Sequence, residues 1–120
     1  MDRIIPMRDL IDQLGSALDA SSLLLGDAIS DKYYADWSGA EPCPPAALLK
    51  PRATDELSTI MALCHQHNQP VVVQGGLTGL AGGATPKFGE VAISLERMSG
   101  VTEVDITGMT LTAEAGTPLQ

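Results

Sequence analysis

A glycine cluster is the part of this sequence whose residue types could form a binding site. The ten residues from Gln74 to Gly83, QGGLTGLAGG, contain five glycines. Glycine loses much conformational freedom on folding, so such a cluster weakens a fold unless left-handed angles or close approach to the main chain require it. Bare main chain presents N–H groups, and several together bind a phosphate. The cluster therefore predicts an anion site, with a long strand connection made of tight turns as the alternative.

Two well-known phosphate loops do not match this cluster. A Walker loop has a Lys and then a Ser or Thr after its last glycine, whereas Gly83 is followed by Ala84 and Thr85. The dinucleotide fingerprint G-x-G-x-x-G fails as well, because Leu77 stands where the second glycine after Gly75 should be. No long helical pattern follows Gly83. The loop is therefore neither a P-loop nor a Rossmann loop.

The elements before the loop must position it. Residues 46–51, AALLKP, predict a short buried strand, and a helix then opens with Thr54 as N-cap and ends at Asn68. Next comes PVVVQ, a β-branched run that predicts an interior strand of a parallel sheet, directly before the glycines. The helix is expected to bury an apolar stripe made of Leu57, Ile60, Met61 and Cys64.

The remaining segments complete an α/β pattern. Apolar spacing predicts an amphipathic helix over residues 7–20, and residues 21–45 are expected to be mostly irregular. After the loop, residues 90–95, 101–106 and 109–116 each have the composition of a strand. The predicted fold class is α/β, or α+β in some schemes: a small parallel sheet with flanking helices, followed by a partly antiparallel segment.

Composition and single side chains exclude several classes of function. The formal charge of -8, with fifteen acidic and seven basic side chains, argues against nucleic acid or anionic lipid as a partner. No apolar run is long enough for a membrane span, and two cysteines without a secretory signal predict a cytoplasmic location. Cys64 lies on the buried stripe while His65 points away from it, so no metal is assigned there. No catalytic residue is assigned either.

Three stretches of the sequence resemble a known family. They are LLKPRATDELSTIMALCHQHNQP (48–70), PVVVQGGLTGLAGGATP (70–86) and EVAISLERMSGVTEVD (90–105). Together they resemble the first lobe of the two-lobe flavin-binding domain in FAD-linked oxidoreductases of the vanillyl-alcohol-oxidase type. The D-lactate, glycolate and D-2-hydroxyacid dehydrogenase branch is the most similar. The resemblance extends from about Asp36 to the last residue.

The resemblance implies a loop that wraps the FAD diphosphate with main-chain N–H groups, and a Thr hydroxyl adds one more donor. No histidine lies in the loop, which implies a non-covalent flavin. Where relatives often have Asn or Gly before the Thr, this chain has Leu77, which implies one polar contact fewer. The implied cofactor-binding residues are Gln74, Gly75, Gly76, Leu77, Thr78, Gly79, Leu80, Gly82, Gly83 and Ala84.

An "Asp-Trp" pair of the same branch matches Asp36 and Trp37, either as a structural pair, with the Trp at the edge of a small core, or near the flavin. The expected organisation is a helical and irregular segment over residues 1–35 and a first FAD lobe over residues 36–120. A second lobe and a cap domain are expected to be absent, as in a truncated chain.

The implied function is the FAD-binding portion of an oxidoreductase that oxidises a small D-2-hydroxyacid. On its own, such a lobe should lack turnover and bind FAD poorly. A non-catalytic module that folds, or forms a homo-oligomer, without binding FAD is the alternative.

Overall fold

The computed structural model describes residues 4–119, and its elements follow the predicted order. No helix in that range is long and apolar enough to cross a membrane. The helices are α1 (Ile4–Ala17), α2 (Thr54–Gln66) and three single 3-10 turns, η1 (Ala20–Ser22), η2 (Gly26–Ala28) and η3 (Asp31–Tyr34). The strands are β1 (Leu23–Leu24), β2 (Ala47–Leu49), β3 (Val71–Gln74), β4 (Val91–Ser94), β5 (Val101–Asp105) and β6 (Thr110–Ala113).

Four of the strands form a small mixed sheet in the order β1-β2-β4-β3. Strands β2, β4 and β3 run parallel, and β1 pairs antiparallel with β2. The prediction that residues 70–74 form an interior strand is wrong, because β3 lies at the edge and Val73 is 48% exposed. An apolar run is typical of a strand buried on both faces, but it does not say whether a second neighbour pairs with its free edge.

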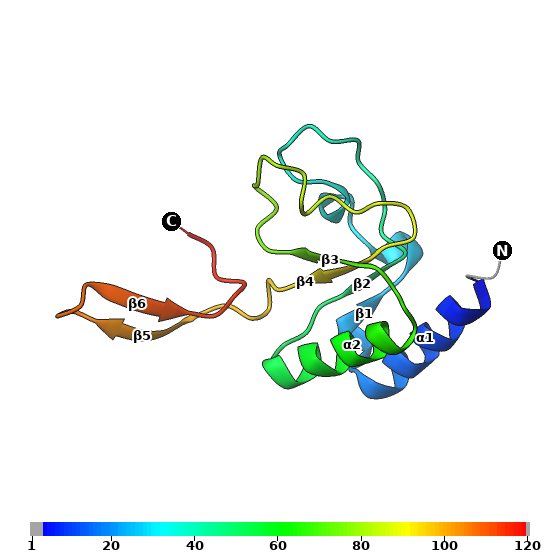
Figure 1. Cartoon of the computed structure of the whole chain (residues 1–120), viewed down its shortest axis with the longest axis horizontal. Coiled ribbons are helices and arrows are strands. Elements are labelled where there is room, and N and C mark those ends of the chain that lie inside the picture. Colours follow the sequence, from blue (N-terminus) through cyan, green and yellow to red (C-terminus); the bar gives the residue numbers. More distant parts are fainter. Residues whose placement is uncertain (1–3, 120) are drawn as a thin grey trace.

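The sheet separates two hydrophobic clusters. Alternate residues of a strand point to opposite faces, so Leu49 and Ile93 pack under the helices with Leu14 of α1 and Ile60 of α2. Figure 1 shows α1 and α2 side by side on that face. The other face carries a smaller cluster made of Ile29, Tyr33, Leu48, Val72 and Ala92. Because α1 packs on the same core as α2, the N-terminal segment is part of the folded unit.

Helix α2 begins differently from the prediction. Thr54 is its first residue and the N-cap position falls on Ala53, which has no side-chain acceptor. The Glu56 carboxylate instead accepts the main-chain N–H of Arg52 at 2.7 Å and pairs with its guanidinium at 2.7 Å. The buried apolar stripe of α2 is also narrower than the predicted one, because Met61 is 42% exposed. A carboxylate in the first turn suits the positive end of the helix dipole.

Strands β5 and β6 form an antiparallel hairpin that projects from the rest of the chain, at the left of Figure 1. Every residue of both strands is exposed. Val104 and Leu111 are cross-strand partners on one face, and they are 65% and 62% exposed. The hairpin is thus amphipathic, with its apolar face uncovered in the described chain.

Candidate cofactor-binding site

The glycine loop leaves the sheet at the carboxyl end of β3, beside the carboxyl ends of β2 and β4. In open α/β sheets this edge is where ligands bind. A hollow of about 440 Å³ opens there, and Gly75, Gly76, Leu77 and Thr78 line it. Lys32 of η3 and the Trp37 side chain lie in the same wall. Four of the predicted cofactor-binding residues therefore share one concave surface.

Gly75 and Gly76 are glycines that the protein's own packing does not require. A Cβ built on either would meet no atom within 4 Å, and neither residue has a positive φ. Steric freedom and close internal contact are the usual reasons for a glycine, and both are missing here. Close approach of a ligand to the main chain remains, and a diphosphate that needs several N–H donors fits it.

Leu77 follows with a left-handed main chain, at φ 63°. Residues with a Cβ adopt this region at a cost of about 1–2 kcal/mol, so the surrounding structure must hold it. The Leu77 side chain does so by packing against the smaller core cluster. The half-buried Leu77 thus anchors the chain directly before Thr78, which is exposed and lines the hollow.

Gln74 holds the loop from beneath and has no exposed surface. Its Nε2 donates to the carbonyl oxygen of Tyr33 at 2.9 Å and to that of Ala84 at 3.0 Å. One side chain thereby ties together η3, the start of the loop and its far end. Among residues 4–119 its buried Oε1 has no hydrogen-bond partner, so it is open to a donor from a water or a ligand.

Asp36 ties down the far end of the loop from the other side. One carboxylate oxygen accepts from the Ser38 N–H at 2.9 Å and from the Thr85 hydroxyl at 3.2 Å. The other accepts from the Ala84 N–H at 3.4 Å. Hydrogen bonds from Ser38, supported by those from Ala84 and Thr85, lower the pKa of Asp36 to about 2. Asp36 is therefore ionised and structural.

Trp37 lies beside the hollow and outside the core. Its main-chain N–H donates to the carbonyl of Gly79 at 2.9 Å, while its side chain is 70% exposed. The expectation of a tryptophan at the edge of a small core is wrong, because Trp37 is largely exposed and lines the hollow. The two residues of the pair therefore differ: Asp36 closes the loop, and Trp37 lies in the wall of the hollow.

The second half of the loop does not join the same hollow. Gly82 and Gly83 line a separate one of about 320 Å³ with Lys87, and Leu80 is 78% exposed. Gly82 has a φ of 84°, so its backbone conformation alone explains the glycine. Contacts from this half to FAD stay a prediction.

A charged cluster at the wall of the hollow, which both Glu96 and Lys32 line, gave no signal in the sequence. Glu96, two residues past β4, accepts from the Tyr33 hydroxyl and pairs with Lys50 Nζ at 3.1 Å and Lys32 Nζ at 3.4 Å. Partial burial opposes ionisation of Glu96, yet these donors hold its pKa below the usual value. Glu96 and Lys50 follow parallel strands, so the strand order brings them together. Lys32 belongs to η3, a 3-10 turn whose position beside these strands has no signal in the sequence.

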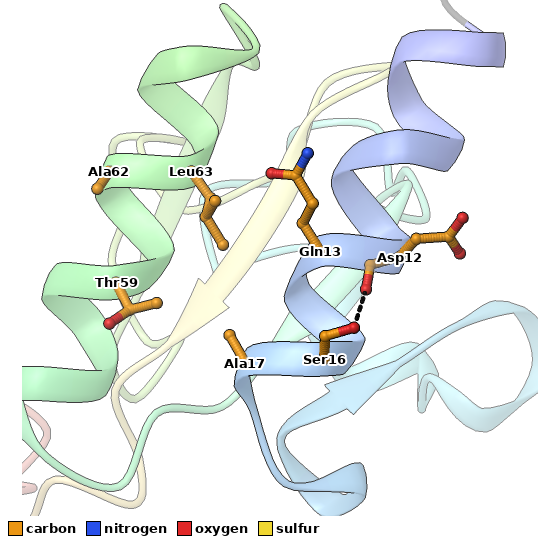
Figure 2. A pocket seen from close by; sticks show the side chains of 7 residues that line it. All are labelled: Asp12, Gln13, Ser16, Ala17, Thr59, Ala62 and Leu63. Atoms are coloured by element: carbon orange, nitrogen blue, oxygen red, sulfur yellow. Dashed lines mark hydrogen bonds between the residues drawn. The ribbon is translucent and has the colours of Figure 1, made fainter.

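A second, larger hollow of about 640 Å³ lies between the two helices. Figure 2 shows Gln13 and Ala17 of α1 facing Thr59 and Leu63 of α2 across it. Its lining residues include no lysine or arginine and no glycine. Without cationic groups or accessible main chain it does not suit a diphosphate.

Comparison with known proteins identifies the family of the chain. The family model described as an FAD binding domain matches residues 45–120, which is more than half of the chain. The chain belongs to this family of FAD-binding domains. The predicted cofactor, FAD, and the predicted family are confirmed.

This FAD-binding domain has relatives that are named as a D-2-hydroxyglutarate dehydrogenase and as a glycolate oxidase subunit. It is 38% identical over 86 residues to the mitochondrial D-2-hydroxyglutarate dehydrogenase of Bos taurus, covering 71% of this chain and 16% of that protein. It is 36% identical over 72 residues to glycolate oxidase subunit GlcD of Bacillus subtilis, covering 60% and 15%. The chain thus spans less than a fifth of these two proteins.

The fold of the FAD-binding domain also recurs in solved structures. The 4-ethylphenol oxidase of Gulosibacter chungangensis superposes with a TM-score of 0.80 at 19% identity, over 93% of this chain and 22% of that one. At that identity the likeness concerns the fold alone. The predicted fold class, α/β with a small sheet and flanking helices as part of a larger FAD-binding domain, is confirmed, although the sheet predicted as parallel is mixed because β1 runs antiparallel.

Proposed function

We propose that residues 75–78 bind the diphosphate of FAD through their main-chain N–H groups, and that the Thr78 hydroxyl adds one donor. The observation that carries this proposal is the open space around Gly75 and Gly76, which the chain's own packing leaves unexplained. Trp37, Lys32 and Glu96 also line the hollow, and the two lysines that pair with Glu96 offset its negative charge. The arrangement supplies donors, a bend and an aromatic face, which bind and orient a cofactor.

We further propose that the whole protein oxidises a small D-2-hydroxyacid. The relatives named for glycolate and D-2-hydroxyglutarate support this substrate class. Bound FAD would supply the redox chemistry by accepting a hydride from the α-carbon of the hydroxyacid. The residues in the hollow bind the cofactor, so activity belongs to the whole protein and not to the region matched here.

A second candidate is a module that associates with a copy of itself without binding FAD. The exposed apolar face of the β5–β6 hairpin favours this candidate, because a second copy that covered Val104 and Leu111 would remove their apolar surface from water. Sedimentation measured with and without FAD separates the two candidates. A dimer that forms without FAD, and in which FAD shifts no loop signal, supports the module.

The test of the cofactor site is an NMR titration of the ¹⁵N-labelled chain with FAD. The sequence has one tryptophan, so Trp37 gives a single indole N–H signal that needs no assignment. We expect FAD to shift this signal together with the amides of Gly75, Gly76 and Thr78. Absence of any shift at millimolar FAD would contradict the proposed site.

Two glycine variants locate the site within the loop. A Cβ at Gly76 or at Gly83 meets no atom within 4 Å, so both Gly76→Ala and Gly83→Ala should fold normally. Only Gly76 lines the hollow with Trp37. We expect Gly76→Ala to weaken FAD binding at least tenfold and Gly83→Ala to weaken it much less. The reverse order would move the diphosphate to the second half of the loop.

A further inference from the structure

Lys32 is the basic residue that faces the ligand space of the glycine loop. Of the lysines and arginines in the described chain, it is the one that lines the hollow with Gly75–Thr78. The loop itself, residues 74–86, contains neither lysine nor arginine. Neutral N–H groups bind a diphosphate better when a cation lies nearby, because hydrogen bonds to charged groups are stronger. The charge that the loop lacks is thus available from η3.

The charges around Lys32 leave one positive charge in excess. Glu96 contributes one negative charge, and two lysines approach it. Lys50 is the closer partner, at 3.1 Å, and its side chain is only 23% exposed. The Tyr33 hydroxyl also donates to the Glu96 carboxylate. Lys50 therefore neutralises Glu96, and the charge of Lys32 remains.

Lys32 is also the more exposed of the two lysines that pair with Glu96. Its Nζ lies 3.4 Å from Glu96, longer than an ordinary hydrogen bond, and its side chain is 59% exposed. Its Nζ lies 4.9 Å from the centre of the Tyr33 ring, which keeps the side chain near the hollow. A rotation of the Lys32 side chain would exchange its contact with Glu96 for a contact with a phosphate oxygen. Glu96 would keep its ion pair with Lys50.

We propose that Lys32 is a positioning residue for the cofactor, and that its ammonium group leaves Glu96 to pair with a phosphate oxygen of FAD. The proposal rests on the proposed binding of the diphosphate at residues 75–78. It adds a side chain from outside the loop and a dependence on ionic strength. The chain has a formal charge of -8, so a local cation also offsets the repulsion of an anionic ligand.

The experiment compares dissociation constants of FAD and ADP for the full chain and three variants, from NMR titration at about 0.02 M and 0.5 M salt. Lys32→Gln removes the charge and Lys32→Arg keeps it. Arg52→Gln is the matched control, because it removes one exposed positive charge that pairs with Glu56 outside the hollow. Circular dichroism of each variant checks the fold.

We expect Lys32→Gln to weaken both FAD and ADP about threefold to tenfold at low salt, and to differ little from the unmodified chain at high salt. Lys32→Arg and Arg52→Gln should stay within about twofold of the unmodified chain. The Lys32 proposal is overturned if FAD shifts the loop amides and Lys32→Gln binds it equally well, or if Arg52→Gln loses as much. If FAD shifts no loop amide in the unmodified chain, the proposed cofactor site fails and this proposal with it.

Discussion

Asp36 and Thr85 form two hydrogen bonds with each other across 49 positions of sequence. The Asp36 main-chain N–H donates to the Thr85 hydroxyl oxygen at 3.1 Å, and that hydroxyl donates to the Asp36 carboxylate at 3.2 Å. Both residues are 8% exposed. The pair joins the segment after η3 to the end of the glycine loop, while Gln74 holds the same loop from beneath. The loop is therefore an ordered part of the fold.

Asp36→Asn should lower the stability of the chain. The Asp36 carboxylate accepts N–H groups from Ser38 and Ala84 as well as the Thr85 hydroxyl, and an amide must turn an NH₂ group toward at least one of these donors. We expect the midpoint of thermal unfolding to fall by about 4–8 °C. Thr85→Ser keeps the hydroxyl and is the matched control, with a smaller change. An unaltered unfolding midpoint in Asp36→Asn would show that the hydrogen bonds of the Asp36 carboxylate do not contribute to stability.

The same carboxylate predicts a pH dependence with a definite sign. Hydrogen bonds from Ser38, with those from Ala84 and Thr85, lower the pKa of Asp36 in the folded chain to about 2 from the usual 3.8. Its contribution is therefore complete above about pH 4 and is lost as the pH falls toward 2. Urea unfolding at several pH values measures this. The stability difference between the unmodified chain and Asp36→Asn should shrink over that interval, and a constant difference contradicts the assignment.

At position 77, a glycine variant should be more stable than an alanine variant, which is the reverse of the usual order. The main chain of Leu77 is left-handed, at φ 63°, where a Cβ is unfavourable and glycine is not. Both Leu77→Ala and Leu77→Gly lose the packing on the smaller core cluster. We expect Leu77→Gly to be the more stable of the two by about 1 kcal/mol, measured by urea unfolding. Alanine as the better residue would mean that the left-handed turn relaxes.

Gly116 and Gly76 both line the hollow but should respond oppositely to alanine. A Cβ at Gly116 would collide with the carbonyl group of Leu95, and the Gly116 N–H donates to the Met98 carbonyl at 2.8 Å. Gly116→Ala should therefore destabilise the chain by about 1–3 kcal/mol. Gly76→Ala should be neutral or slightly stabilising, because alanine restricts the unfolded chain. Unfolding curves of the two variants decide, and equal effects would contradict the geometry.

The β5–β6 hairpin should be the least protected regular element of the isolated chain. All of its residues are exposed, and a two-stranded hairpin is at best marginally stable without a covered face. We expect the amides of Val104 and Leu111 to exchange hydrogen much faster than those of Ala92 and Ile93, which are fully buried in β4. Hydrogen exchange followed by NMR gives the comparison. Similar protection in both elements would mean that the hairpin is covered in solution.

Much of the fold could be predicted because its signals are local. The β-branched run before Gln74, the turn at Asn68 and the glycines each act on neighbouring residues, and Asn68 indeed has a left-handed φ of 51°. The errors concern distant neighbours. The β-branched run that includes Val73 predicts an interior strand of the sheet, yet the strand order places β3 at an edge. Met61 reads as buried, yet it is exposed because its side of α2 has no partner.

For the site, the sequence by itself determined that a glycine-rich loop follows a strand, because glycine density and strand composition are properties of adjacent residues. The tertiary structure alone decided that residues 75–78 share a hollow from which Gly82 and Gly83 are excluded. It also decided that Asp36 closes the loop and that Lys32 faces it. The physical reason is that parallel strands bring their carboxyl ends to one edge, where residues far apart in sequence meet.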